Sequence, residues 1–248
     1  MSRKRAAIVL GASGSVGNAL ITELFRDGSF DPVITLSRRS ASEVIVIARE
    51  AGRTVQEQIV PEMNAQALEA ATLAALRDVE GEVEGFSVLG VGSNTAKLTL
   101  DAHRAVDVAL NEAFAKALKA SGKVRHFGLM TAAGADPNAK STGSGAAGMS
   151  RYNRVKGEAE QAARANGPAI VSIFRPAMIV GSQHTPWLIE KTLPLFSFVT
   201  PAKYQSITVT QIAKAMIAAA KEYPATSAVH HYPEMMALID RSTSQSQR

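Results

Sequence analysis

Tyr152 and Lys156 have the residue types and the spacing of a proton-transfer pair. Residues four apart on a helix lie on one face. An ammonium group beside a phenol lowers the phenol pKa, so that the phenol can give or take a proton near neutral pH. The pair is therefore a candidate acid/base for chemistry at an oxygen atom.

Three glycines, Gly11, Gly14 and Gly17, follow a short apolar run at residues 6–10. In a dinucleotide-binding turn, the first glycine allows the tight turn, the second lets backbone approach a pyrophosphate, and the third lets the helix pack on the strand. The helix N-terminus then offers N–H groups to an anion. The spacing is GxxGxxG, and no Gly-Lys-Ser/Thr of a Walker loop follows. The alternative is a plain strand-to-helix turn. The predicted cofactor-binding residues here are Gly11, Ala12, Ser13, Gly14, Ser15, Val16 and Gly17.

A second cofactor contact is predicted at Ser37, Arg38 and Arg39, just past the second apolar run. An NAD-binding chain usually places an acid here for the ribose 2′-hydroxyl, whereas guanidinium groups suit a 2′-phosphate. The alternative is two surface arginines at a strand end. We predict NADP(H) as the cofactor, with Lys156 holding its ribose hydroxyls.

Alternating apolar runs and helical patterns must position these residues. Ser42–Glu50 is ambiguous, because Val44 to Ile47 favour a strand whereas Ser42 and Gly52 favour a capped helix. We choose a helix, because a parallel sheet needs a crossover there. The other predicted strands cover residues 6–10, 32–36, 54–60, 85–89, 124–130 and 169–174, and the other helices residues 15–25, 65–77, 100–120, 150–166 and 210–222. The order predicts an α/β fold with a doubly wound parallel sheet, the Rossmann fold.

We expect one NAD(P)-binding domain over residues 1–240 with a small C-terminal appendage on the substrate side. Substrate-side segments are predicted near residues 134–149 and 181–206, and a disordered tail at 241–248. The Gly/Ser-rich stretch 134–149 is long for a connection, so we predict a lid there. Trp187 either caps the substrate entrance or packs in the interior.

Composition excludes several other classes of protein. The 248 residues contain no cysteine, which excludes disulfides, thiolate metal sites and a thiol nucleophile. The five histidines predict no metal site. The absence of cysteine suits a reducing cytosol, so we expect a cytoplasmic protein. No apolar run is long enough to cross a bilayer, so we expect no membrane partner. The net charge is +5, but the basic residues are scattered along the sequence, which favours a solvated basic surface over a nucleic-acid site. We expect a small-molecule substrate, and the choice between monomer and homodimer stays open.

Together these motifs resemble the short-chain dehydrogenase/reductase superfamily, and the GxxGxxG spacing is typical of its extended and atypical branches. The chain is most similar to the Tat-interacting-protein type of atypical reductase, over about residues 6 to 222. The similar stretches are Leu-Gly-Ala-Ser-Gly at 10–14, the Arg38–Arg39 pair, Arg125-His126-Phe127, Gly134-Ala135-Asp136 and Lys156-Gly157-Glu158.

The resemblance implies further cofactor contacts. The Arg175-Pro176-Ala177 turn resembles one whose backbone touches the nicotinamide carboxamide, and the loop around Gly90 resembles one that lines the cofactor. The implied cofactor-binding residues are Gly90, Val91, Gly92, Thr131, Tyr152, Lys156, Pro176, Ala177 and Met178.

One departure from the family concerns a hydroxyl. These enzymes usually place a serine after the fifth strand, where it polarises the substrate carbonyl, but the register gives Ala132 here. Thr131 is the predicted substitute, Ser141 or Ser144 could reach in from the loop, or the donor is lost. We expect an NADP(H)-dependent oxidoreductase with Tyr152, Lys156 and Thr131 as its catalytic residues. The alternative is an NADPH-binding regulatory or protein-interaction module with little or no turnover.

Overall fold

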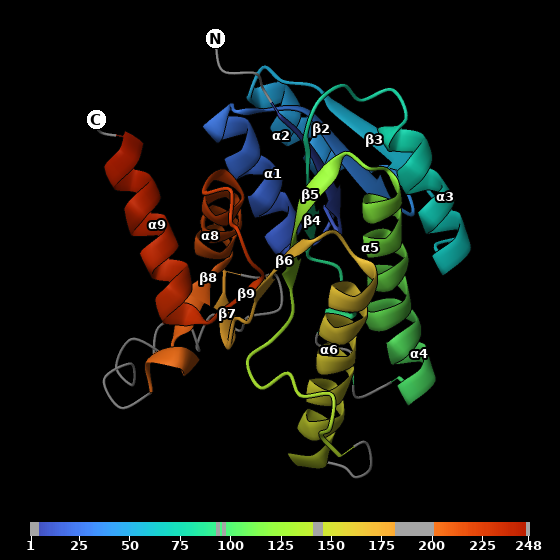
Figure 1. Cartoon of the computed structure of the whole chain (residues 1–248), viewed down its shortest axis with the longest axis vertical. Helices are drawn as coiled ribbons and strands as arrows, with labels where there is room; N and C mark the ends of the chain where they lie inside the picture. The colour runs from blue at the N-terminus through green and yellow to red at the C-terminus, as the bar shows by residue number, and fades with distance from the viewer. Residues whose placement is uncertain (1–4, 93–94, 96–97, 141–145, 182–200, 247–248) are drawn as a thin grey trace.

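Seven parallel strands form the central sheet of the chain (Figure 1). The computed structural model describes residues 5–92, 95, 98–140, 146–181 and 201–246. The strand order is β3-β2-β1-β4-β5-β6-β9, so the chain winds outward from β1 in both directions. The strands are β1 (Arg5–Leu10), β2 (Phe30–Ser37), β3 (Val55–Ile59), β4 (Val83–Ser87), β5 (Val124–Met130), β6 (Ile170–Phe174) and β9 (Ala228–His230). The predicted doubly wound sheet is confirmed.

Helices cover both faces of the sheet, because its central strands are apolar on both sides. In β1, Ala7 and Val9 face one core while Ala6, Ile8 and Leu10 face the other. The first core lies under α1 (Ser15–Asp27), α2 (Ser42–Glu50), α8 (Val209–Lys221) and α9 (Tyr232–Ser246). The second lies under α3 (Ala65–Leu76), α5 (Asn111–Ala120) and α6 (Ala146–Asn166). The ambiguous stretch is helix α2, as predicted.

The long helix predicted over residues 100–120 is interrupted. It consists of α4 (Leu100–Arg104), a π-helical turn η2 (Ala105–Leu110) and α5. A π-helical turn adds one residue to the helical repeat and is frequent at functional sites. The side chains of this turn therefore take directions that a regular helical pattern does not predict.

The C-terminal part differs most from expectation. Beside the segment predicted to lie on the substrate side, the structure has the short parallel pair β7 (Met178–Val180) and β8 (Ser206–Thr208), with the turn η3 (Ala202–Tyr204) before β8. Strand β9 and helix α9 follow at the C-terminal end, where the sequence analysis assigned no element. Trp187 lies outside the described residues.

The predicted disordered tail is wrong for residues 241–246, which continue helix α9. The Thr243 and Ser244 hydroxyls donate to backbone carbonyls one turn earlier, at 3.0 and 2.9 Å. Arg241 Nε also donates to Glu222 Oε1 at 2.7 Å, which ties the helix to the end of α8. Polar composition alone did not reveal these local contacts.

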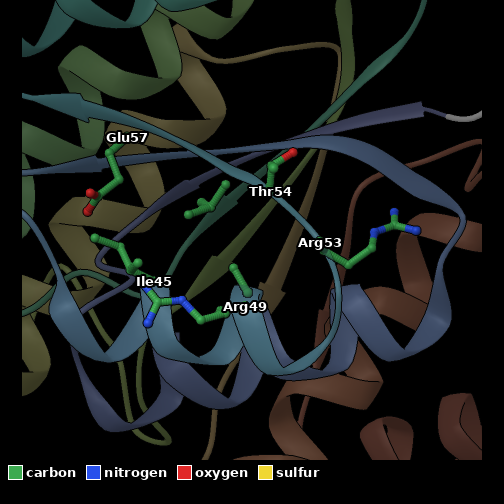
Figure 2. A pocket seen from close by; sticks show the side chains of 7 residues that line it. Ile45, Arg49, Arg53, Thr54 and Glu57 are labelled. Carbon is green, nitrogen blue, oxygen red and sulfur yellow. The ribbon is translucent and has the colours of Figure 1, made fainter.

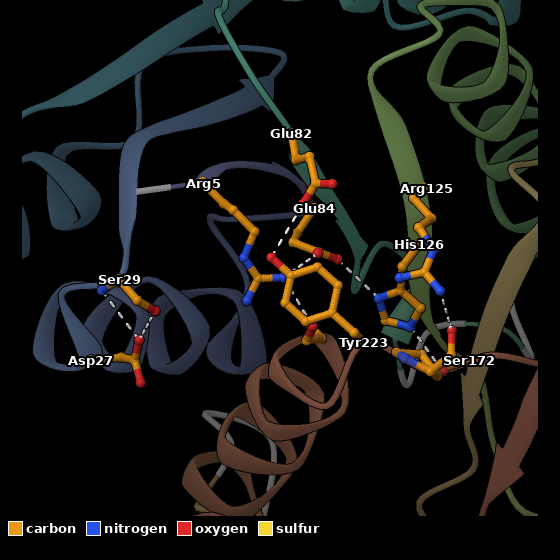
Figure 3. Close-up of polar contacts among 11 residues, drawn as sticks. Arg5, Asp27, Ser29, Glu82, Glu84, Arg125, His126, Ser172 and Tyr223 are labelled. Carbon is orange, nitrogen blue, oxygen red and sulfur yellow. Dashed lines mark hydrogen bonds and ion pairs between the residues drawn. The ribbon is translucent and has the colours of Figure 1, made fainter. Parts of the chain in front are cut away.

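A buried polar network joins the first halves of four strands (Figure 3). Arg5 Nη1 donates to Glu84 Oε1 at 2.5 Å, and His126 Nδ1 lies 3.0 Å from Glu84 Oε2. His126 Nε2 lies 2.9 Å from Ser172 Oγ. All four side chains are buried, so their mutual bonds offset the loss of water.

Among the helices that the structure describes, none combines the length and the hydropathy of a membrane span.

Candidate cofactor and proton-transfer site

The turn between β1 and α1 has the close packing that the glycines predicted. Gly11 has φ of 90°, and a Cβ there would lie 2.7 Å from the Leu89 nitrogen. A Cβ on Gly17 would overlap the Gly11 carbonyl oxygen. Gly14 differs, since a Cβ there would meet only that same oxygen, at 3.6 Å. Gly14 begins α1 without a side-chain cap, and the first turn holds no acid. A helix that begins without a side-chain cap and without an acid in its first turn suits an anion such as a dinucleotide pyrophosphate.

Arg38 and Arg39 lie exposed beyond the end of β2, and the Ser37 hydroxyl donates to the Arg39 carbonyl at 2.7 Å. The sequence places no acid at this strand end, but the fold brings one from β3. Glu57 accepts from the Ser40 hydroxyl and the Ala41 amide, each at 2.8 Å. Two hydrogen bonds therefore hold the Glu57 carboxylate against residues 38–41, which we call the arginine loop.

Lys156 and Tyr152 come together on helix α6, as their spacing predicted. The Lys156 Nζ lies 5.5 Å from the centre of the Tyr152 ring and donates to Asp107 Oδ1. A Cβ on Gly90 would come within 2.9 Å of the same Nζ, so the loop after β4 packs directly on the lysine. Because Leu89 in that loop also contacts Gly11, one short segment joins the glycine turn to Lys156.

Asp107, on the π-helical turn, is a functional candidate that the sequence analysis missed. Its fully buried carboxylate binds Lys156 through Oδ1 and accepts from the Val91 amide through Oδ2, at 3.0 Å. Asn111 connects the π-helical turn to strand β4. Its Nδ2 donates to the Asp107 carbonyl at 2.8 Å, and its Oδ1 accepts from Ser87 at 2.5 Å.

Asp107 and Lys156 keep each other charged. Burial opposes the charge on Asp107, but Lys156 and His103 outweigh it and lower the pKa of the carboxyl to about 2. Burial likewise opposes the charge on Lys156, but Tyr152 and Asp107 raise the pKa of its ammonium group above the ordinary value. The two groups therefore form an ion pair across the neutral range.

His103 completes this cluster and was also missed. Its fully buried ring stacks on Tyr152, with the ring centres 6.0 Å apart and the planes at 24°. Its Nε2 lies 3.7 Å from Asp107 Oδ2, beyond hydrogen-bond length, and neither ring nitrogen has a partner among the described residues. The recurrence of His103, Asp107 and Asn111 every four residues was the available sequence signal. No three His, Asp or Glu side chains in the described ranges could hold a metal ion.

Thr131 is not placed as the second proton donor that we predicted. Its hydroxyl is buried and donates to Glu160 Oε1 at 2.7 Å. Glu160 is paired in turn with Arg175 through two bonds, at 2.8 and 2.5 Å. The Thr131 hydroxyl therefore stabilises the buried carboxylate of an ion pair whose arginine is half-buried. Ala132 beside it supplies no hydroxyl, and Ser141 and Ser144 lie outside the described residues.

Half of the predicted lid packs against helix α6. The Asp136 amide donates to the Asn153 carbonyl at 3.0 Å. A Cβ on Gly134 would lie 3.0 Å from the Asn153 side chain, and one on Gly157 would overlap the backbone nitrogen of Pro137. Residues 134–140 are thus held by close contacts, residues 141–145 lie outside the described chain, and α6 begins at Ala146.

The turn after β6 lies beside the end of β5. The Pro176 carbonyl accepts from the Ala133 amide at 2.8 Å, and Pro176 is buried, whereas Ala177 and Met178 are exposed. The structure places this turn at the carboxyl edge of the sheet, where open α/β sheets bind their ligands.

A pocket of about 490 Å³ lies elsewhere, between α2 and β3 (Figure 2). It contains two arginines and one acid but none of the predicted cofactor or catalytic residues. Its lining is Ile45, Ala48, Arg49, Arg53, Thr54, Val55 and Glu57.

No protein-family model matches the sequence. Among solved structures, the chain is similar to a short-chain dehydrogenase/reductase from Serratia marcescens, with a TM-score of 0.64, 18% identity and coverage of 94% of this chain and 99% of that one. An alcohol dehydrogenase from the archaeon Thermococcus sibiricus, complexed with 5-hydroxy-NADP, gives 0.63 at 18% identity, covering 93% and 97%. The yeast methylglyoxal/isovaleraldehyde reductase Gre2, complexed with NADPH, gives 0.60 at 16% identity, covering 91% and 78%. The chain therefore has the fold of the short-chain dehydrogenases/reductases.

Proposed function

We propose that this chain is an NADP(H)-dependent oxidoreductase of short-chain dehydrogenase/reductase type, from an atypical branch, that interconverts a carbonyl and an alcohol in a small molecule. One observation carries the proposal. The buried Lys156 ammonium lies between the Tyr152 ring and the Gly90 loop, and Leu89 in that loop packs against Gly11 of the glycine turn. A proton donor, a cation and an anion-binding turn thus share one edge of the sheet.

The residues present fit a dinucleotide. The N-terminus of α1 would hold the pyrophosphate, and Lys156 the ribose hydroxyls next to the nicotinamide. Arg38 and Arg39 would pair with a 2′-phosphate, which favours NADP(H) over NAD(H). Two of the similar structures contain NADPH or an NADP derivative, which supports this choice. When bound, the nicotinamide supplies or accepts the hydride.

This chain's own contribution is the proton. In reduction, the Tyr152 hydroxyl gives its proton to the oxygen of the substrate carbonyl, and in oxidation the phenolate takes it from the alcohol. The nearby Lys156 ammonium stabilises the phenolate that forms. His103, stacked on the ring, keeps the phenol in one orientation.

The test is oxidation of NADPH with a panel of aldehydes and ketones, for the wild type and Tyr152→Phe. The phenylalanine keeps the ring and its stacking but has no proton to transfer. We expect turnover to fall by about 10²–10⁴-fold while NADPH affinity is kept. Failure of the wild type to bind either NADPH or NADH would contradict the proposal.

The second candidate function is an NADPH-binding regulatory module. The observation that favours it is the missing hydroxyl, because Ala132 has none and Thr131 donates to Glu160. Ala132→Ser separates the two. An enzyme that is weakened by a missing donor should gain turnover, since one such donor contributes about 2.7–4 kcal/mol. A regulatory module would bind NADPH and stay inert in the wild type, in Tyr152→Phe and in Ala132→Ser.

A further inference from the structure

Asp107 bonds both to the lysine of the site and to the loop beside it. One carboxylate oxygen binds Lys156, and the other accepts from the Val91 amide at 3.0 Å. Both charged side chains are buried. An ammonium group with no water around it keeps its charge only when a partner compensates it.

The π-helical turn is what delivers this carboxylate. Asn111 donates to the Asp107 carbonyl and is itself held by Ser87 at the end of β4. The turn is therefore fastened to the strand that leads into the Gly90 loop. A regular α-helix over the same residues would lack the extra residue of the π-helical turn. The Asp107 carboxylate would then point in a different direction around the helix axis.

We propose that Asp107 is the positioning residue of Lys156. It fixes the ammonium against Gly90, between the Tyr152 ring and the loop, and keeps it charged before any ligand arrives. Asp107 touches no reacting atom and acts only through the lysine. The role in turnover depends on the proposed function, whereas the pairing itself does not.

The proposal concerns charge as well as position. The titratable groups that act on Lys156 are Asp107 from η2, and Tyr152 and Glu160 from α6 itself, whereas His103 from α4 lies beside Asp107. Of these, Asp107 is the acid bonded to the ammonium. Without it, burial would act on a cation whose bonded counterion is gone, and the pKa of Lys156 would fall.

The first experiment titrates Lys156 in Asp107→Asn by NMR of ¹⁵N-labelled lysine side chains, without cofactor. The asparagine oxygen can still accept from Val91, so only the charge is lost. We expect the titration midpoint of Lys156 to fall by at least about one pH unit. The control is Glu158→Gln, because Glu158 pairs with Arg104 at 2.6 Å and Arg154 at 2.9 Å and has no bond to the lysine. It should leave the Lys156 midpoint unchanged.

The second readout is turnover against pH. Misplacement of the ammonium in Asp107→Asn should lower kcat/KM by about 10²-fold. Because Lys156 loses its charge at lower pH in the variant, the alkaline limb of the profile should move toward neutral pH. A merely structural role for Asp107 would lower the melting temperature and leave the shape of the profile as it is.

A third comparison measures stability and tests the proposal even if Asp107→Asn does not fold. Asp107→Leu leaves the lysine buried without its counterion, whereas Asp107→Leu with Lys156→Met removes both charges. Replacing a whole buried ion pair is far less damaging than breaking it. The double variant should therefore melt at a higher temperature than the single one. An equal or lower melting temperature would overturn the proposal.

The outcomes separate this inference from the proposed function. A shifted Lys156 midpoint in a protein that turns over no carbonyl supports the pairing and counts against the oxidoreductase. An active wild type whose Asp107→Asn variant keeps both the Lys156 midpoint and the alkaline limb supports the oxidoreductase and overturns the role of Asp107.

Discussion

At the scale of single residues, the site depends on charges that neighbouring groups preserve in the interior. Lys156 has Asp107, and Glu160 has Arg175 together with the Thr131 hydroxyl. Each buried charge is both paired and hydrogen-bonded, which is the condition for keeping it at acceptable cost. The stability of the protein should therefore depend on these acids remaining ionised.

Because of Asp107, the unfolding free energy of the protein should depend measurably on pH. The pKa of its carboxyl is about 2 in the folded chain, against 3.8 for the ordinary group. Its stabilising effect is thus complete above about pH 4 and is lost as the pH falls toward 2. We expect the difference in unfolding free energy between wild type and Asp107→Asn to shrink by about 2 kcal/mol over that window. Chemical denaturation at several pH values measures it, and a constant difference would contradict the pairing.

Cofactor choice is also decided by single residues. If Arg38 forms a charged hydrogen bond to a 2′-phosphate, Arg38→Ala should weaken NADPH binding by about 1.5–3 kcal/mol and leave NADH binding nearly unchanged. Isothermal titration with both cofactors measures the two affinities. Equal affinities in the wild type would contradict the preference.

Glu57 supplies the matched control, since its carboxylate lies at the base of the same loop and bonds to Ser40 and Ala41. Glu57→Gln keeps a side-chain oxygen as an acceptor and removes a negative charge near the phosphate position. It should strengthen NADPH binding, the opposite sign to Arg38→Ala.

At the scale of elements, the turn from β1 to α1 contains one glycine with no room for a side chain and another with room for one. A methyl group on Gly17 would overlap the Gly11 carbonyl, whereas one on Gly14 has room within the protein. Both glycines lie in one short turn, but only at Gly17 do neighbouring backbone atoms occupy the place of a side chain.

Gly17→Ala should therefore destabilise the chain by about 1–3 kcal/mol, the usual cost of overpacking. Gly14→Ala should keep the melting temperature to within a few degrees but weaken NADPH binding, because its methyl group would point at the pyrophosphate. Thermal unfolding and cofactor titration of both variants distinguish the two roles. Loss of stability in Gly14→Ala with cofactor binding intact would reverse the assignment.

At the scale of the whole molecule, the same four strands carry two separate groups of polar residues. The carboxyl ends of β1, β4, β5 and β6 lead into the candidate site. The buried network of Arg5, Glu84, His126 and Ser172 joins these strands before their carboxyl ends (Figure 3). This polar network joins the strands through side chains that are not among the candidate cofactor residues.

Breaking this network should change stability and leave binding alone. Glu84→Gln leaves the buried Arg5 guanidinium without its counterion, so we expect a loss of about 3 kcal/mol in unfolding free energy. NADPH affinity of the folded protein should not change. Glu82→Gln is the control, because Glu82 is exposed and its carboxylate accepts a hydrogen bond from the Tyr223 hydroxyl at 3.2 Å. This substitution should cost less than about 0.5 kcal/mol. A large loss of affinity in Glu84→Gln would show that the two groups of polar residues are coupled.

The sequence by itself determined the local and periodic features of this protein. Apolar runs alternating with helical patterns predicted the parallel sheet, because a strand buried on both faces must be apolar throughout. The spacing of Tyr152 and Lys156 predicted their shared helix face, and Gly11 and Gly17 predicted a turn with no room for side chains.

Only the tertiary structure decided which polar groups meet across elements. Asp107 reaches Lys156 from a helix about fifty residues earlier in the chain, through a π-helical turn that periodicity does not reveal. Glu57 reaches the loop of Arg38 and Arg39 from the next strand, and Glu160 accepts the hydrogen bond of the Thr131 hydroxyl. A sequence pattern records spacing along one element, whereas the partner of a buried charge is chosen by packing between elements, where low polarity makes an unpaired charge too costly.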